Sequence, residues 1–210
     1  MLGMAEAPQL TYISIPDAAN VLQRGIEWYL GQRGETFVEV SFSYKNKSGE
    51  TVTYYPYREV ADWLSDNKGR GLLLYGSCGL GKTMLGRYVL PQILYHYNTP
   101  RKITHTYSIT ELNDEQKLNE ALGFNILSVD DVGVEENMVV YGKRRNPFDE
   151  IMDAVEKFGK LIIITTNLTQ KELTERYGTR VMDRIKATTR RVVFDLYDEK
   201  GQRMSLRRYD

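Results

Sequence analysis

One eight-residue segment limits the fold of this chain more than any other feature. Residues 76–83 read Gly-Ser-Cys-Gly-Leu-Gly-Lys-Thr and match the pattern G-x-x-x-x-G-K-[ST] in full. An apolar run over 71–75 precedes the segment and a helical pattern over 82–97 follows it. Glycines let backbone N–H groups turn inward, where these groups and the helix N-terminus attract an anion. The segment therefore predicts a phosphate-binding loop that joins a buried strand to a helix.

The residue types inside this loop have separate tasks. Lys82 can place a full positive charge on the β- and γ-phosphates of a nucleotide, and the Thr83 hydroxyl can bind Mg²⁺. Cys78 allows two interpretations, a redox-sensitive thiol or a passive loop position. The residues predicted to bind nucleotide are Gly76, Ser77, Cys78, Gly79, Leu80, Gly81, Lys82 and Thr83.

Strands and helices alternate along the chain from Pro56 onward. The pattern predicts strands over 71–75, 102–109, 126–129, 161–165 and 191–196, and helices over 60–64, 82–97 (bent at Pro91), 110–122 (capped by Thr110), 147–158 and 170–186 (broken near Gly178). Such alternation predicts an α/β fold of three αβα layers around a parallel five-stranded sheet. Residues 197–210 are too few for a full helical lid.

The first 55 residues have a different organisation. Residues 1–13 predict a loose arm, and a helical stripe then begins at Pro16 and Asp17 and ends at Gly31. Alternating patterns over 38–44 and 51–55 flank a turn and predict a hairpin. We therefore expect an accessory segment, 1–55, of one helix and one β-hairpin, before a nucleotide-binding domain over 56–210.

Composition excludes several classes of protein. The 28 basic and 28 acidic side chains give a formal net charge of zero, so bulk charge does not attract nucleic acid. One cysteine and two histidines exclude a disulfide framework and argue against a structural zinc site. Neither a secretory signal nor an apolar run long enough to span a bilayer is recognisable. We expect a cytoplasmic protein without a membrane partner.

Two further apolar strands end in polar residues. The strand over 126–129 is followed by Asp130, which can hold Mg²⁺, and by Asp131, which can polarise an attacking water; capping of a turn is the alternative for both. The strand over 161–165 leads to Asn167, which either orients the water and contacts the γ-phosphate or, like Thr169, caps the next helix. No guanine-specifying N/T-K-x-D motif follows, which argues against a GTPase.

Arg180 and Arg184 are four residues apart, so a helix places them on one face. They are either ordinary surface and ion-pairing residues, with Glu175 and Asp183 as partners, or they include an arginine finger that reaches the nucleotide of a neighbouring subunit.

The order of these motifs resembles a known family. The phosphate loop, Asp130-Asp131-Val132-Gly133, Thr165-Thr166-Asn167-Leu168 and Tyr177-Gly178-Thr179-Arg180-Val181-Met182-Asp183-Arg184 together resemble the AAA+ ATPases of the DnaC/DnaI-like helicase loaders and the IstB-like transposition helpers. The resemblance covers about residues 56–196. It implies sheet order 5-1-4-3-2, a Walker B role for Asp130 and Asp131, a sensor 1 role for Asn167, the finger role for Arg184 and a sensor 2 role for Arg207.

The resemblance also implies partners. These are ATP with Mg²⁺, a replicative helicase or a transposase, single-stranded DNA, and further copies of the chain in a nucleotide-dependent homo-oligomer. Residues 17–55 do not resemble the loader domain that grips the helicase. A basic loop of Lys143, Arg144 and Arg145, beside Tyr141 and Phe148, is either a DNA-contacting surface or a solvated loop.

We therefore expect an ATP-hydrolysing switch protein of the DNA replication or transposition machinery, a weak ATPase unless assembled or stimulated. A small-molecule phosphotransferase with the same loop is the alternative, since Arg144 and Arg145 can imitate the arginine lid of such an enzyme. A nucleotide-dependent adaptor that binds ATP without turnover is a second rival, against which Asp131 and Asn167 argue. Tyr54, Tyr55 and Tyr57 either border the adenine or form a packed aromatic hinge.

Overall fold

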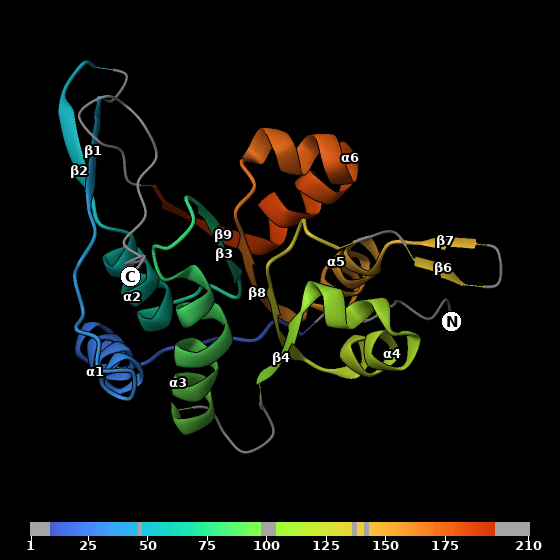
Figure 1. Ribbon diagram of the computed structural model, residues 1–210, viewed down its shortest axis with the longest axis horizontal. Coiled ribbons are helices and arrows are strands. Elements are labelled where there is room, and N and C mark those ends of the chain that lie inside the picture. Colours follow the sequence, from blue (N-terminus) through green and yellow to red (C-terminus); the bar gives the residue numbers. More distant parts are fainter. Residues whose placement is uncertain (1–8, 46–47, 98–103, 136–137, 141–142, 196–210) are drawn as a thin grey trace, which may run out of the picture.

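A five-stranded parallel sheet forms the centre of the molecule (Figure 1). The computed structural model describes residues 9–45, 48–97, 104–135, 138–140 and 143–195, with backbone alone for 138–140, 143 and 144. The strands lie in the order β4-β5-β8-β3-β9. Counted along the chain, this order is 2-3-4-1-5, the expected order read from the other edge. The strands are β3 (Gly71–Gly76), β4 (Thr104–Ser108), β5 (Ile126–Asp130), β8 (Leu161–Thr166) and β9 (Thr189–Phe194).

Helices cover both faces of this sheet and give the expected three layers. Successive side chains of a strand point to opposite faces, so Leu72 and Leu74 belong to one buried cluster and Leu73 to the other. The first cluster includes side chains of α1 (Ala18–Gly31), α2 (Pro56–Ser65) and α3 (Leu90–Tyr97). The second includes side chains of α4 (Glu115–Gly123), α5 (Pro147–Phe158) and α6 (Gln170–Thr188).

The helix after the phosphate loop widens before its proline. Its central part, η1 (Met84–Val89), is a π-helix that continues directly into α3. Pro91 has no backbone N–H, and its ring would clash with the carbonyl four residues before it in a regular α-helix. A wider helical turn relieves this clash, so the expected disturbance at Pro91 takes the form of a π segment.

The start of α4 differs from the sequence prediction, whereas the break inside α6 agrees with it. A short 3₁₀ helix, η2 (Ile109–Asn113), precedes α4, and Asp114 caps α4 by accepting from the Lys117 N–H at 2.9 Å. Thr110 is therefore not the cap, because Asp114 starts the regular helix four residues later. In α6, Gly178 has a non-helical backbone with φ of 81°, which confirms the expected break.

The N-terminal region packs against the part of the chain that follows Pro56. Ile13 is 2% exposed, and its N–H donates to the Asn67 side chain, so the end of the expected loose arm is held in place. Helix α1 contacts α2, η1 and α3. The expected hairpin forms from β1 (Phe42–Lys45) and β2 (Thr51–Tyr54), and it extends away from the sheet (Figure 1). The domain boundary at residue 55 stays a prediction.

A second hairpin was not expected from the sequence. β6 (Met138–Val140) pairs with β7 (Lys143–Arg145) and projects beside α5 (Figure 1). The prediction of a basic loop over this segment is therefore wrong, because the backbone of 143–145 is tied into an antiparallel ladder. Within the described ranges, no helix is both long and apolar enough to cross a membrane.

Candidate phosphate-binding site

The loop between β3 and the following helix depends on three glycines. Gly76, Gly79 and Gly81 have φ values of 123°, 78° and 91°, which residues with a Cβ atom rarely adopt. A Cβ atom on Gly81 would lie 2.4 Å from the Tyr57 hydroxyl, so this glycine is required by space as well as by conformation. The two glycines of the pattern G-x-x-x-x-G-K-[ST], Gly76 and Gly81, therefore stand where the backbone has a conformation that residues with a Cβ atom rarely adopt.

Lys82 folds over this loop. The side chain is buried, and its Nζ atom donates to the carbonyl oxygens of Gly76 at 3.1 Å and Ser77 at 2.5 Å. A lysine ammonium has three N–H donors. Its position fixes the positive charge at the loop, where the sequence predicts phosphate.

Tyr57 supports the loop from α2. Its hydroxyl donates to the Leu80 carbonyl at 3.1 Å, and its ring packs edge-on against Phe194. Burial raises the pKa of the Tyr57 hydroxyl, so this group stays a neutral donor. Of the three tyrosines considered for the adenine, Tyr57 thus has a packing role beneath the loop. Tyr55 stacks under the Arg58 guanidinium, and Tyr54 Oη accepts from the Val193 N–H.

The other predicted site residues come to the same edge of the sheet. In the parallel register Tyr75 lies beside Thr166 and Val129 beside Ile164, so the carboxyl ends of β3, β8 and β5 are level. Ligands of open parallel sheets bind at this edge. The order of the strands places Asn167, after β8, between the phosphate loop and Asp130.

Thr165 links the two aspartates. Asp130 is 3% exposed and accepts from the Thr165 hydroxyl at 2.5 Å. The same hydroxyl oxygen accepts from the Asp131 N–H at 3.0 Å. Asp131 has φ of 57°, an uncommon left-handed conformation for a residue with a side chain. Sequence reasoning did not single out Thr165, although its place in the Thr-Thr-Asn segment was a usable signal.

Asn167 is exposed and is not the helix cap. Thr169 caps α6, because its hydroxyl accepts from the Glu172 N–H and Glu172 accepts from the Thr169 N–H. The capping alternative for Asn167 is therefore wrong. Thr166 directs its hydroxyl to the Val132 carbonyl at 2.5 Å, which ties the end of β8 to the loop after β5.

The donor set fits a magnesium ion. Thr83 supplies a half-buried hydroxyl and Asp130 a buried carboxylate, and hard oxygen ligands of this kind, with retained waters, are what Mg²⁺ prefers. Cys78, the loop residue that the sequence allows as a redox-sensitive thiol or as a passive position, is exposed.

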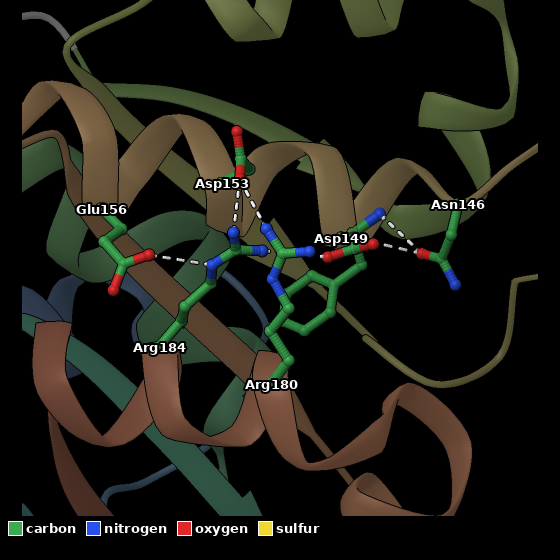
Figure 2. A network of polar contacts seen from close by, with 7 residues as sticks. Asn146, Asp149, Asp153, Glu156, Arg180 and Arg184 are labelled. Carbon is green, nitrogen blue, oxygen red and sulfur yellow. Dashed lines mark hydrogen bonds and ion pairs between the residues drawn. The ribbon is translucent and has the colours of Figure 1, made fainter.

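The two arginines of α6 bind carboxylates of α5 (Figure 2). The Arg184 side chain is 7% exposed and donates to Glu156 at 2.9 Å, to Asp149 at 3.2 Å and to Asp153. Arg180 is 79% exposed and lies 3.7 Å from Asp153. The shared partner confirms that both arginines lie on one face.

The expected ion-pair partners of these arginines have other contacts. Glu175 pairs with Lys171, and Asp183 pairs with Lys186. The arginines thus make ion pairs, but with carboxylates of a different helix. Whether one of them serves as a finger stays a prediction.

The basic hairpin differs from the expected aromatic and basic surface. Arg145 forms a bidentate pair with Glu150 at 2.6 and 2.8 Å and contacts Glu115 at 3.2 Å. The bond to Glu150 raises the Arg145 pKa. Phe148 is fully buried against Tyr177, so it cannot stack on a base. The side chains of Lys143 and Arg144, and the residues Tyr141 and Arg207, lie outside the described part of the chain.

Comparisons with known proteins identify the fold. No protein-family model and no curated protein matches the sequence. The crystal structure of the DnaC helicase loader is 23% identical with a TM-score of 0.50, and the alignment covers 60% of this chain and 78% of that chain. The crystal structure of DnaI is 22% identical with a TM-score of 0.50, over 66% of this chain and 82% of that chain. The resemblance is confirmed at the level of the fold: this chain shares the three-layer α/β fold of the DnaC helicase loader and of DnaI.

Proposed function

We propose that this chain binds and hydrolyses ATP as a switch protein of the AAA+ class. The observation that carries the proposal is the meeting of three groups at one sheet edge. These are the glycine loop with Lys82, the Asp130–Thr165–Asp131 cluster, and the exposed Asn167 between them. Hydrolysis of a nucleotide needs a cation at the phosphates, a carboxylate that holds the metal ion and a group that positions the attacking water.

Each residue has a distinct task in this proposal. The loop N–H groups and Lys82 hold the phosphates, and Thr83 and Asp130 hold Mg²⁺. The metal ion, when bound, neutralises charge that develops on the phosphate oxygens. Asp131 accepts a proton from the attacking water, and Asn167 orients that water or contacts the γ-phosphate. Arg184, with Arg180 beside it, acts on the nucleotide of a second chain, and Arg207 contacts the nucleotide as sensor 2.

The cellular task that we propose is the loading of a replicative helicase or the assistance of a transposase. The solved structures with this fold include a helicase loader by name, which supports the first task. Single-stranded DNA is a proposed partner through Lys143 and Arg144. ATP turnover would then change the contacts with the protein or DNA partner in the cytoplasm, and a nucleotide-dependent homo-oligomer would complete the site.

One of the two arginines on which the phosphotransferase alternative depends is engaged elsewhere. A small-molecule kinase usually has a lid with arginines over the phosphates, where they stabilise charge in the transition state. Arg145 is instead held by Glu150 and Glu115, in the hairpin beside α5. A metabolite screen for phosphorylated products tests this alternative directly.

The proposed partner is best tested by capture from a cell extract with ATP and with ADP. We expect a helicase or transposase to be retained by the wild-type chain with ATP and released with ADP, and not retained by Lys82→Ala in either case. Retention that is independent of the nucleotide would contradict a switch.

A further inference from the structure

A buried carboxylate lies just beyond the aspartates. Glu135 is 3% exposed, and both of its carboxylate oxygens have partners. One oxygen accepts from the Gly133 N–H at 2.9 Å, and the other accepts from the Tyr177 hydroxyl. Arg176 lies 3.8 Å from the carboxylate and donates to the Glu135 backbone carbonyl. Glu135 thereby connects the segment after β5 to helix α6.

The segment that Glu135 holds has an unfavourable backbone. Asp131 has φ of 57° and Gly133 has φ of 111°. Only glycine enters the second region readily, and a Cβ atom there would lie 2.4 Å from the Leu168 side chain. A residue with a side chain is destabilised in the left-handed region, because its Cβ atom comes close to the following carbonyl oxygen. Such conformations persist where surrounding contacts hold them, and they concentrate at functional sites.

Contacts from two different elements hold this backbone. At the first end, β8 holds Asp131 and Val132, because Thr165 accepts the Asp131 N–H and its backbone carbonyl accepts the Val132 N–H at 2.9 Å. At the second end, the fixation is by Glu135 and its partners on α6. The position of the Asp131 side chain therefore depends on β8 and on α6 together.

The carboxylate of Glu135 is engaged in structure rather than exposed to a reacting water. Burial and the bond to Glu135 raise the pKa of Tyr177, so its hydroxyl remains a donor to the carboxylate. The helix that supplies Tyr177 also carries Arg180 and Arg184.

We propose that Glu135 is a positioning residue that fastens the segment 131–135 to α6. It thereby couples the position of Asp131 to the helix that carries Arg180 and Arg184. The proposal rests on the proposed ATPase function. It assigns Glu135 no direct contact with ATP or water.

Three variants separate positioning from chemistry. Glu135→Gln keeps the geometry, since its amide oxygen can accept from Gly133 while its amide nitrogen donates to the Tyr177 oxygen. Glu135→Ala removes every side-chain bond, and Tyr177→Phe removes one. Removal of a partner that orients a metal ligand costs about 10–100-fold in metal affinity or activity, and we expect a loss of the same order where the oriented residue is Asp131. The control is Glu150→Ala, which deletes an arginine-paired carboxylate on α5.

We expect kcat for ATP to fall about 10–100-fold in Glu135→Ala and less in Tyr177→Phe. We expect Glu135→Gln and Glu150→Ala to stay near wild type, and ATP affinity to change little in all four. A rate in Glu135→Gln as low as in Glu135→Ala would show that the charge itself is catalytic and would overturn the proposal. So would an unchanged rate in Glu135→Ala.

Amide hydrogen exchange gives a readout that needs no turnover. The Gly133 and Val132 amides should exchange faster in Glu135→Ala and as slowly as wild type in Glu135→Gln and Glu150→Ala. If these amides exchange as slowly in Glu135→Ala as in wild type, Glu135 does not hold the segment 131–135 and the proposal is wrong. If the wild-type chain hydrolyses no ATP, the proposed function fails, and this exchange comparison alone decides whether Glu135 holds the loop.

Discussion

Thr165 fixes Asp130 and Asp131 with a single hydroxyl group. The hydroxyl donates a hydrogen bond to the Asp130 carboxylate at 2.5 Å, and its oxygen accepts one from the Asp131 N–H at 3.0 Å. Because Thr165 is itself a buried residue of β8, the side chain has little freedom to move. A residue of β8, a strand that carries neither aspartate, therefore helps to hold Asp130 and Asp131 in position relative to each other.

We predict that Thr165→Val lowers ATP turnover about 10–100-fold, because valine keeps the shape and removes both bonds. The buried Asp130 carboxylate loses a donor, which costs about 1–3 kcal/mol of the free energy of unfolding. Steady-state kinetics and denaturant unfolding measure the two effects. Thr165→Ser restores the hydroxyl and should recover most of both, and an unchanged rate in Thr165→Val would contradict the role of Thr165.

Arg184 and Arg180 should differ sharply in their contribution to stability. Arg184→Ala leaves three carboxylates of α5 without their buried partner, so we expect the free energy of unfolding to fall by about 1–3 kcal/mol. Arg180→Ala removes one exposed, long contact and should stay within about 0.5 kcal/mol of wild type. Thermal unfolding of both variants measures this difference. Equal losses of the free energy of unfolding would contradict the different burial and ion pairing of the two arginines.

The finger prediction needs an experiment between chains. Arg184→Ala and Lys82→Ala should each be inactive alone, whereas a mixture should recover ATP hydrolysis, because an intact arginine of one chain completes the intact loop of the other. An arginine finger contributes about 10³–10⁵ in rate where it operates. A mixture of Arg180→Ala with Lys82→Ala is the matched comparison. Absence of recovery in demonstrably mixed oligomers would leave Arg184 as an ion-pairing residue.

His105 should make the fold less stable in acid. Its ring stacks on Phe124 with centroids 3.3 Å apart, and burial lowers its pKa. At His105 the folded state therefore binds fewer protons than the unfolded state near and below the ordinary histidine pKa of about 6.5. The contribution of His105 to the free energy of unfolding is lost as the pH falls through this range. We predict a smaller loss of unfolding free energy between pH 7.5 and 5 in His105→Gln than in wild type. An identical dependence of the unfolding free energy on pH in His105→Gln and in wild type would contradict the prediction.

The sequence predicted those parts of the fold that depend on local pattern. The phosphate loop, helix α5 over Pro147–Phe158 and the break at Gly178 follow from glycine and proline positions and from periodicity. The β6–β7 hairpin escaped prediction because its three-residue strands are too short for a period to be recognised.

Partners that are distant in sequence could not be predicted in the same way. Spacing showed that Arg180 and Arg184 share a face, but it suggested neighbours in the chain as their partners, whereas the partners lie on α5. Thr165 and Glu135 acquire their roles only when β8 and α6 are brought beside the segment after β5. Tertiary packing, and not local pattern, decides such contacts.

The proposed ATP hydrolysis is tested most directly by the ATPase rate of the wild-type chain beside Lys82→Ala and Asp131→Asn, with Mg²⁺, over a range of protein concentrations. We predict measurable turnover in the wild type that rises more than linearly with protein concentration. Lys82→Ala should lose turnover and most of its ATP affinity, and Asp131→Asn should keep the affinity and lose the rate. Equal phosphate release from wild type and Lys82→Ala would contradict the account.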